Sequence, residues 1–255
     1  MTLKFIGLGL HDGRGISMRG IEEARKCDVV YAEFYTTPMP ELDVEWIQGV
    51  IGRKIKVLKR EDVEEGKCII RDAMERDVAL LVGGDPMAAT THLSLRIEAM
   101  KRGIKTVVVH SESIFTAAAS AAGLQHYKFG RTITIPWVRD NYFPMSPYDM
   151  LARNRAEGKH TLVLLDTEPK DGQIMRACDA VEILLMMEEA GRKGVFSKDT
   201  RIFALARVGS TEPFVIFGRA ERIMEASMPE PPHTIIVPGE MHFMEEEFAN
   251  LVAID

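Results

Sequence analysis

The stretch that decides the fold is LLVGGDPMAATTH, residues 80–92, in which an apolar run ends abruptly on Gly83 and Gly84. A short apolar run bounded by turn residues is typical of a strand inside a parallel sheet. The paired glycines let the backbone after this strand come close to another group, because no side chain intervenes. Asp85 follows them and would repel a phosphate, so the loop favours a ligand with a positive charge or hydroxyl donors. The simpler alternative is that Asp85 caps a helix that begins nearby.

Short apolar runs and amphipathic segments alternate along the first half of the chain. The expected strands are LKFIGLGL, DVVYAEFY, VALLVGG and KTVVVH, and helical spacing is found in ISMRGIEEARKC, residues 63–76 and THLSLRIEAMKRG. This alternation predicts a parallel sheet covered by helices on both faces. In such a sheet, ligands bind beyond the carboxyl ends of the strands.

The second half of the chain predicts a different sheet. Its candidate strands are HYKFGRTITIP, HTLVLLD, RIFALARVG, PFVIFG and HTIIVPG, with two long helices near residues 147–157 and 175–189. RVGSTEPFVIFG indicates two strands joined by a short turn, so this sheet should be mixed. We therefore predict an α/β protein with two αβα domains, residues 1–112 with a parallel sheet and residues 113–255 with a mixed sheet. The alanine-rich SIFTAAASAAGL is the expected linking helix.

Composition limits the functional classes. The chain has 255 residues and 46% hydrophobic residues, enough for a substantial core. Its formal charge of −6 opposes binding to phosphate backbones, so we expect no nucleic-acid partner. No apolar stretch approaches the roughly 20 residues of a membrane span, and MTLKFIGLGLHDG lacks the features of a secretion signal. These observations predict a cytoplasmic protein with no membrane contact.

Several familiar motifs are incomplete. FIGLGLHDGRG is similar to a dinucleotide-binding turn, but Asp12 stands where the third glycine is needed. His110 and Ser111 are adjacent in VVVHSESIF, yet no nucleophile elbow surrounds the serine, so hydrolase chemistry is not favoured. The three cysteines are far apart and the seven histidines lack ligand spacing, so we expect no metal. EEARK and MEEEF are interpreted as solvated helix faces.

Together, the strand-end loops resemble the tetrapyrrole methylase-like family. The segments that carry this resemblance are FIGLGLHD, AEFYT, LLVGGDPMAATTH, VHSESIF, LLD at 164–166, ALARVGS at 204–210 and PHTIIVPGEMHFME. They extend over almost the whole chain. Each is weakly diagnostic alone, whereas the set is specific.

The resemblance implies a methyl donor, S-adenosylmethionine, which is converted to S-adenosylhomocysteine without a metal. It implies that the donor lies in a cleft between the two domains. The residues that it places around the donor are Leu10, Asp85, Ala88, Ser113, Ile114, Leu165, Val208 and His233. Many of these would act through main-chain groups, with Gly9, Gly83, Gly84 and Gly209 beside them allowing close approach.

The resemblance also implies an acceptor. The similar members add three methyl groups to the amino group of a modified histidine on elongation factor 2, and they are usually homodimers. The apolar segments 113–124 and 181–191 could form a subunit contact or core. The short chain lacks an acidic or polar tail, which favours the archaeal type of this activity. A related methylase of a small tetrapyrrole and a non-catalytic, cofactor-binding partner of translation remain as alternatives.

The sequence does not select a catalytic base. Methylation of an amine requires its neutral form, so each transfer follows the loss of a proton. Orientation of the reacting atoms can supply up to about 7–11 kcal/mol of the barrier reduction, and solvent can take the proton. The candidate bases near expected strand ends are Asp166, Glu168, Glu33, Tyr35 and His110.

Overall fold

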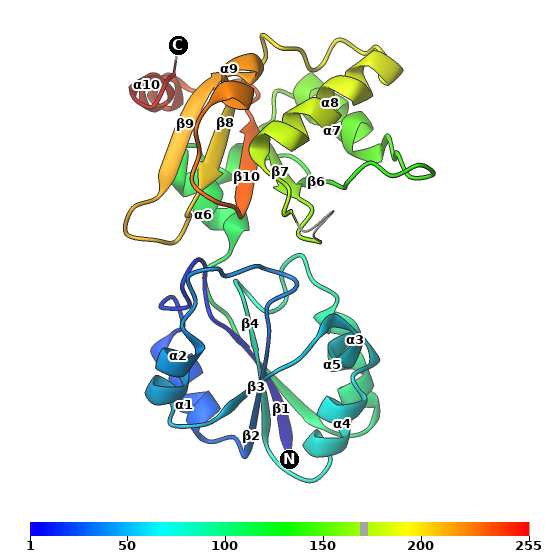
Figure 1. The fold of residues 1–255 in the computed structure, drawn as a ribbon, viewed down its shortest axis with the longest axis vertical. Coiled ribbons are helices and arrows are strands. Elements are labelled where there is room, and N and C mark those ends of the chain that lie inside the picture. The colour runs from blue at the N-terminus through cyan, green and yellow to red at the C-terminus, as the bar shows by residue number, and fades with distance from the viewer. Residues whose placement is uncertain (169–172, 255) are drawn as a thin grey trace. The chain divides into compact units, whose positions relative to one another are not determined.

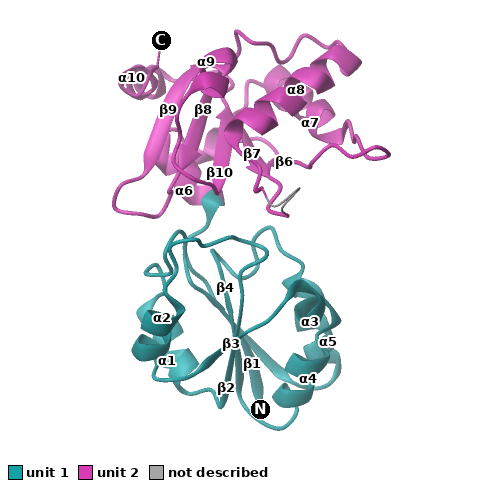
Figure 2. Cartoon of the chain, in the orientation of Figure 1, with its two compact units in different colours: residues 1–114 teal, residues 115–255 magenta. Residues whose placement is uncertain are grey.

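The computed structural model describes residues 1–168 and 173–254. The chain divides into two compact units, Met1–Ile114 and Phe115–Asp255, here called unit 1 and unit 2 (Figure 2). Each unit has its own sheet.

Unit 1 contains a five-stranded sheet in the order β3-β2-β4-β1-β5, and all its strand pairs are parallel. Its strands are β1 (Thr2–Gly7), β2 (Val29–Glu33), β3 (Ile55–Val57), β4 (Val78–Val82) and β5 (Lys105–Val109). Every residue of β4 is buried because strands flank it and helices cover both of its faces. The predicted parallel sheet is confirmed.

Two helical layers cover the sheet of unit 1 (Figure 1). The helices are α1 (Met18–Arg25), α2 (Val44–Ile51), α3 (Arg60–Glu65), α4 (Lys67–Ala73) and α5 (His92–Lys101). Alternate residues of β4 point to opposite faces: Leu80 packs in the core shared with α3, α4 and α5, and Leu81 in the core shared with α1 and α2. Unit 1 is therefore a three-layer αβα structure.

Two details of unit 1 differ from the prediction. The single helix expected over residues 63–76 is two helices, α3 and α4, which meet at Gly66. Gly66 has a φ of 65°, and a Cβ there would lie 2.6 Å from a methyl group of Leu95. The edge strand β3 was not predicted, because it has only three residues and two of them are exposed.

Unit 2 contains a mixed five-stranded sheet in the order β6-β7-β10-β8-β9. Its strands are β6 (Ile133–Ile135), β7 (Thr161–Leu165), β8 (Arg201–Ala206), β9 (Phe214–Arg219) and β10 (His233–Val237). β6 and β7 are parallel, whereas the other pairs are antiparallel. The mixed sheet and the β8–β9 hairpin are confirmed. The strand expected over residues 126–136 is wrong in extent, since His126–Lys128 is a 3-10 helix, η1.

The helices of unit 2 lie on both sides of this sheet (Figure 1). They are α6 (Ile114–Ala121), α7 (Ser146–Ala156), α8 (Ala177–Gly191), α9 (Ala220–Glu225) and α10 (Phe243–Leu251). The two long helices predicted from the sequence correspond to α7 and α8, which share one core with α9 and the sheet. MEEEF is only partly a solvated face, because Glu245 in α10 is fully buried.

Candidate functional site

Three loops of unit 1 follow adjacent strands and so meet at one edge of the sheet. Loop A (residues 8–17) follows β1, loop B (83–91) follows β4 and loop C (110–113) follows β5. β1 lies between β4 and β5. Because the three strands are parallel, their carboxyl ends bring the three loops together.

Loops A and B are joined through their glycines. Gly84 N–H donates to Gly9 O at 2.7 Å, and Gly9 N–H donates to Gly84 O at 3.4 Å. Both residues have positive φ, 74° for Gly9 and 68° for Gly84, which side chains disfavour. A Cβ on Gly9 would lie 2.7 Å from both Glu112 Oε1 and Gly15 Cα, so this glycine makes room for the protein itself. A Cβ on Gly84 would make only ordinary contacts, the nearest at 3.8 Å with the Leu10 side chain, so its positive φ rather than a lack of room favours glycine there.

Loop C holds loop A in place. The Leu10 backbone N–H donates to Glu112 Oε1 at 3.2 Å, and the Ser111 hydroxyl donates to the Gly15 carbonyl at 2.8 Å. Leu10 is 6% exposed. Its backbone and side chain are therefore fixed before any ligand arrives.

Asp85 connects loop B to loop C. Its Oδ2 accepts a hydrogen bond from His110 Nδ1 at 2.7 Å and a longer one from the Ser111 N–H at 3.4 Å. Its Oδ1 accepts from the Met87 N–H at 2.9 Å. The interpretation of Asp85 as a helix cap is wrong, because α5 begins only at His92, after the N-cap residue Thr91.

A buried contact between a histidine and a carboxylate behind loop B was missed by the sequence analysis. His92 Nε2 and Glu33 Oε1 are 3.3 Å apart, and both side chains are fully buried. His92 Nδ1 lies 3.2 Å from the carbonyl oxygen of Pro86, and Glu33 Oε2 accepts the N–H groups of Tyr35 and Thr36. This pair therefore anchors loop B to the segment after β2. A carboxylate at the end of an apolar strand was the available signal.

The other predicted residues of unit 1 lie in or beside these loops. Ala88 donates its N–H to the Asp85 carbonyl at 3.2 Å, which closes the turn of loop B. Ser113 ends loop C, and Ile114 begins α6; both are half-buried. The structure thus brings Leu10, Asp85, Ala88, Ser113 and Ile114 to the same edge of the unit 1 sheet.

The predicted residues of unit 2 also share one sheet edge. Leu165 is the last residue of β7, and His233 is the first residue of β10. β10 runs antiparallel to β7 and β8, with His233 opposite Ala206, the last residue of β8. Val208 follows two residues later, in a turn where Gly209 has a φ of 95°.

The His233 ring has no free nitrogen. Its Nδ1 accepts the Ala177 N–H at 3.1 Å, and its Nε2 donates to the Pro229 carbonyl at 2.7 Å. Burial lowers the pKa of His233, so the ring is neutral. The ring therefore holds the start of α8 and the loop before β10, and only the backbone of His233 remains to contact a ligand.

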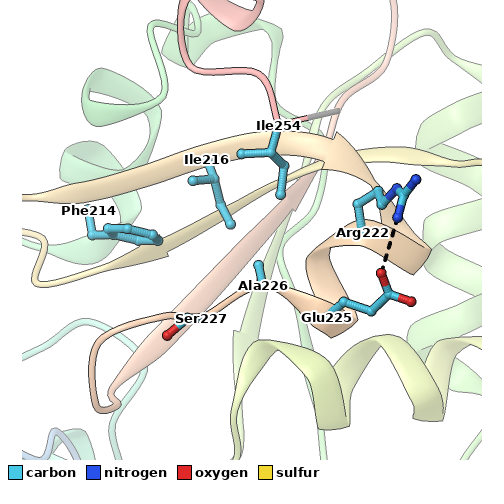
Figure 3. A pocket seen from close by; sticks show the side chains of 7 residues that line it. All are labelled: Phe214, Ile216, Arg222, Glu225, Ala226, Ser227 and Ile254. Atoms are coloured by element: carbon cyan, nitrogen blue, oxygen red, sulfur yellow. Dashed lines mark hydrogen bonds and ion pairs between the residues drawn. The ribbon is translucent and has the colours of Figure 1, made fainter.

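A separate hollow in unit 2 offers little chemistry (Figure 3). It is lined by Phe214, Ile216, Arg222, Glu225, Ala226, Ser227 and Ile254. Its two charged side chains pair with each other, Arg222 Nη1 and Glu225 Oε2 being 3.3 Å apart. Within residues 1–168 and 173–254, no three His, Cys, Asp or Glu residues are grouped to hold a metal ion. No helix of this described part is long and apolar enough to cross a membrane.

Residues 2–223 match the family described as tetrapyrrole (corrin/porphyrin) methylases. The chain belongs to the tetrapyrrole methylase family. Its relatives include a diphthine synthase of Methanothermobacter thermautotrophicus, 45% identical over 96% of this chain and 93% of that protein. The diphthine synthase of Methanocaldococcus jannaschii is 40% identical over 94% of this chain and 95% of that protein. A crystal structure of a diphthine synthase aligns with a TM-score of 0.89 at 35% identity, covering 99% of this chain and 96% of that one.

Membership of the tetrapyrrole methylase family confirms the resemblance and the predicted fold class. The family and its named relatives also support a methyltransferase. The contacts of the eight residues with a methyl donor stay a prediction.

Proposed function

We propose that this chain transfers three methyl groups from S-adenosylmethionine to the amino group of the modified histidine of elongation factor 2, which gives diphthine. The observation that carries the proposal is the similarity to archaeal proteins named diphthine synthase, at 45% and 40% identity over nearly full length. We further propose that the enzyme is of the archaeal type and acts in the cytoplasm as a homodimer. The organisms of these two relatives support the archaeal type.

The residues of unit 1 fit such a methyl donor. S-adenosylmethionine carries a sulfonium, an ammonium group and ribose hydroxyls, all of which suit a carboxylate. Asp85 Oδ1 accepts one hydrogen bond, from Met87, and an ionised carboxylate oxygen can accept a second. Gly84, whose φ is positive, and the apolar Leu10 side chain lie in the same pair of loops.

The residues of unit 2 are suited to contact a methyl donor through main-chain groups and apolar side chains. Leu165 is 8% exposed and packs in the core of unit 2, Val208 is half-buried in the turn after β8, and the His233 ring is fully engaged within the unit. We propose that both sets of residues contact the methyl donor.

The chemistry makes modest demands on such a site. When bound, S-adenosylmethionine supplies an electrophilic methyl group, and positive charge moves from sulfur to nitrogen without a new anion. The protein has to orient the amine in line with the methyl group and the sulfur, and to exclude water from them. A fixed loop cluster such as the one around Asp85 suits that task.

Two alternative functions are less well supported. A methylase of a small tetrapyrrole shares the family, but the relatives described above are named for diphthine synthesis. A non-catalytic, cofactor-binding partner of translation is not favoured by similarity to named enzymes over nearly the full chain.

The test is incubation with labelled S-adenosylmethionine and elongation factor 2 carrying the unmethylated precursor. We expect the intact mass of the factor to rise by three CH₂ units, as three methyl groups replace three protons. A parallel reaction with a small tetrapyrrole substrate should give no product. Tight binding of the methyl donor without any methylated product would favour the non-catalytic alternative.

A further inference from the structure

A proton acceptor is required for the proposed N-methylation. The amine of the acceptor is protonated near neutral pH, and its lone pair becomes available only when an N–H bond breaks. A second and a third transfer each need another proton to leave. The structure distinguishes among the five candidate bases that the sequence left open.

Two of these candidates lie in the interior of unit 1. Glu33 is fully buried, and its carboxylate accepts hydrogen bonds from the N–H groups of Tyr35 and Thr36 and from the Thr36 hydroxyl, besides facing His92. Burial raises the pKa of Tyr35 to about 12, so its basic form is scarce near neutral pH. Neither side chain is suited to receive a proton from a bound substrate.

Two further candidates are engaged in unit 2. The Asp166 oxygens accept the N–H groups of Trp137 at 3.2 Å and Glu168 at 3.0 Å, and so close a turn after β7. The Glu168 carboxylate faces the guanidinium of Arg139 at 3.9 Å. A proton on either carboxyl group would weaken contacts that the structure already makes.

His110 has the geometry of an oriented base. Its side chain is 73% exposed, and its Nδ1 lies 2.7 Å from Asp85 Oδ2. An ionised carboxylate only accepts hydrogen bonds, so Nδ1 carries the hydrogen and Nε2 carries the lone pair. Within the described part of the chain, Nε2 has no hydrogen-bond partner. The carboxylate thus fixes the tautomer and turns the basic nitrogen outward.

The surroundings of His110 support this reading. Asp85, from loop B, is the ionisable group that contacts the ring. Glu112 is two residues away, and its Oε1 is turned toward the Leu10 N–H of loop A. The neighbouring Ser111 hydroxyl donates to the Gly15 carbonyl, so it is not the group that His110 activates.

We propose that His110 Nε2 is the catalytic base that accepts the proton of the substrate amine, and that Asp85 is its positioning residue. The proposal rests on the proposed N-methyltransferase function. The substrate N–H bond breaks, and its proton binds Nε2 to give an imidazolium beside the Asp85 carboxylate. The amine lone pair then forms the bond to the methyl carbon, and the electrons of the carbon–sulfur bond stay on sulfur. The imidazolium releases its proton to water before the next round.

The substitution His110→Asn removes the basic nitrogen but keeps a side chain that can contact Asp85. The asparagine amide can still donate to Asp85, whereas it offers no basic nitrogen. In single turnovers with labelled S-adenosylmethionine and elongation factor 2 carrying the unmethylated precursor, we expect the rate to fall about 100-fold or more. Affinity for S-adenosylmethionine, measured by calorimetry, should change by no more than about twofold.

Two further measurements identify a base. Added imidazole should restore part of the rate of His110→Asn. The wild-type rate should rise with pH and then level, while the rate of the variant keeps rising with hydroxide concentration. His126→Asn, a change at an exposed histidine of unit 2, is the matched control and should behave as wild type.

Each adverse result has a distinct meaning. A His110→Asn variant with the wild-type rate and pH profile would overturn the proposal. Reduced affinity for S-adenosylmethionine, with no rescue by imidazole, would also overturn it by making His110 a binding residue. If the wild-type enzyme leaves the factor unmethylated, the proposed function itself fails and the proposal fails with it.

Discussion

Among the histidine–carboxylate pairs of the protein, His110–Asp85 in unit 1 and His160–Glu245 in unit 2 use the same groups in opposite ways. In unit 1, His110 Nδ1 donates to Asp85, the ring is 73% exposed, and Nε2 is unengaged among the described residues. In unit 2, His160 and Glu245 are fully buried, with His160 Nε2 3.3 Å from Glu245 Oε1. The Gly239 N–H donates to His160 Nδ1 at 2.9 Å, so both ring nitrogens are engaged.

The difference shows how burial assigns a role to such a pair. Burial lowers the pKa of His160, and its two bonds fix a neutral ring with the hydrogen on Nε2. Glu245 Oε2 also accepts from Lys128, and Glu245 Oε1 from the Gln125 N–H, so the pair ties α10 to the segment before β6. A buried pair with every nitrogen engaged stabilises a fold. An exposed pair with one free nitrogen is available for proton transfer.

The largest expected effect is the loss of stability in Glu245→Ala. Removing the buried Glu245 carboxylate leaves Lys128 without its ion-pair partner and the neutral His160 ring without its acceptor, which costs about 3–5 kcal/mol. We expect urea denaturation to show a fall of that size in the free energy of unfolding. Glu246→Ala, an exposed neighbour on α10, is the matched control and should change it by less than about 0.5 kcal/mol. If Glu245→Ala and Glu246→Ala lowered the free energy of unfolding equally, the buried pair would have no special role in stability.

The pH dependence of this stabilisation should be the next largest effect. Burial acts to raise the pKa of Glu245, but hydrogen bonds from Lys128 and from the N–H groups of Gln125 and His242 lower it to about 2. Its stabilisation is therefore present above the ordinary value of 4.5 and is lost as pH falls from 4.5 to about 2. Burial also lowers the pKa of His160, so proton uptake by the unfolded chain below pH 6.5 acts in the same direction.

Urea titrations at several pH values check this expectation. The difference in the free energy of unfolding between wild type and Glu245→Gln should shrink as pH falls through the window of Glu245. A difference that stays constant from pH 6 to pH 2 would contradict the assigned role of the carboxylate.

A smaller effect is expected for Asp85→Asn, and it concerns the affinity for S-adenosylmethionine rather than stability. The change removes the negative charge but keeps the size of the side chain. A hydrogen bond to a charged group contributes about 1.5–3 kcal/mol, so affinity for S-adenosylmethionine should fall about 10- to 100-fold in calorimetry. Asp149→Asn, at a half-exposed carboxylate of α7, is the control. Unchanged affinity in Asp85→Asn would separate Asp85 from the methyl-donor site.

The smallest effect is expected for Ser111→Ala. The hydroxyl makes one hydrogen bond, to the Gly15 carbonyl at 2.8 Å, so its loss should cost about 0.5–1.5 kcal/mol in thermal or urea unfolding. Methylation should persist in this variant, because His110 and not Ser111 is the proposed base. A loss of activity larger than the loss of stability would call for a direct role of the hydroxyl.

Much of the fold could be predicted because local signals and the final structure agree. The strand that ends on Gly83 and Gly84 is fully buried, as its unbroken apolar run indicates. The break at Gly66 could not be read in the same way, since a lone glycine is often tolerated inside a helix. Gly66 adopts a left-handed conformation that ends α3, and the Leu95 side chain, from a helix distant in the sequence, leaves no room for a Cβ at this position.

The candidate site was predictable in location but not in its contacts. Strand ends in one sheet indicate where loops meet, which placed Asp85 and His110 each at the carboxyl end of a predicted strand of the same sheet. Glu245 was read as solvent-facing because its partner His160 lies 85 residues away, and no spacing rule joins the two. The eight residues expected around the methyl donor come from the family resemblance, and packing alone would not have selected them.

The reciprocal bonds between Gly9 and Gly84 have a consequence for redesign of this enzyme. The amide and the carbonyl of each glycine form hydrogen bonds with the other loop, so the backbone conformation of each loop depends on the other. Grafting one of these loops from a relative with another specificity would leave unmatched polar groups at the junction. Loops A and B therefore have to be exchanged together in any redesign.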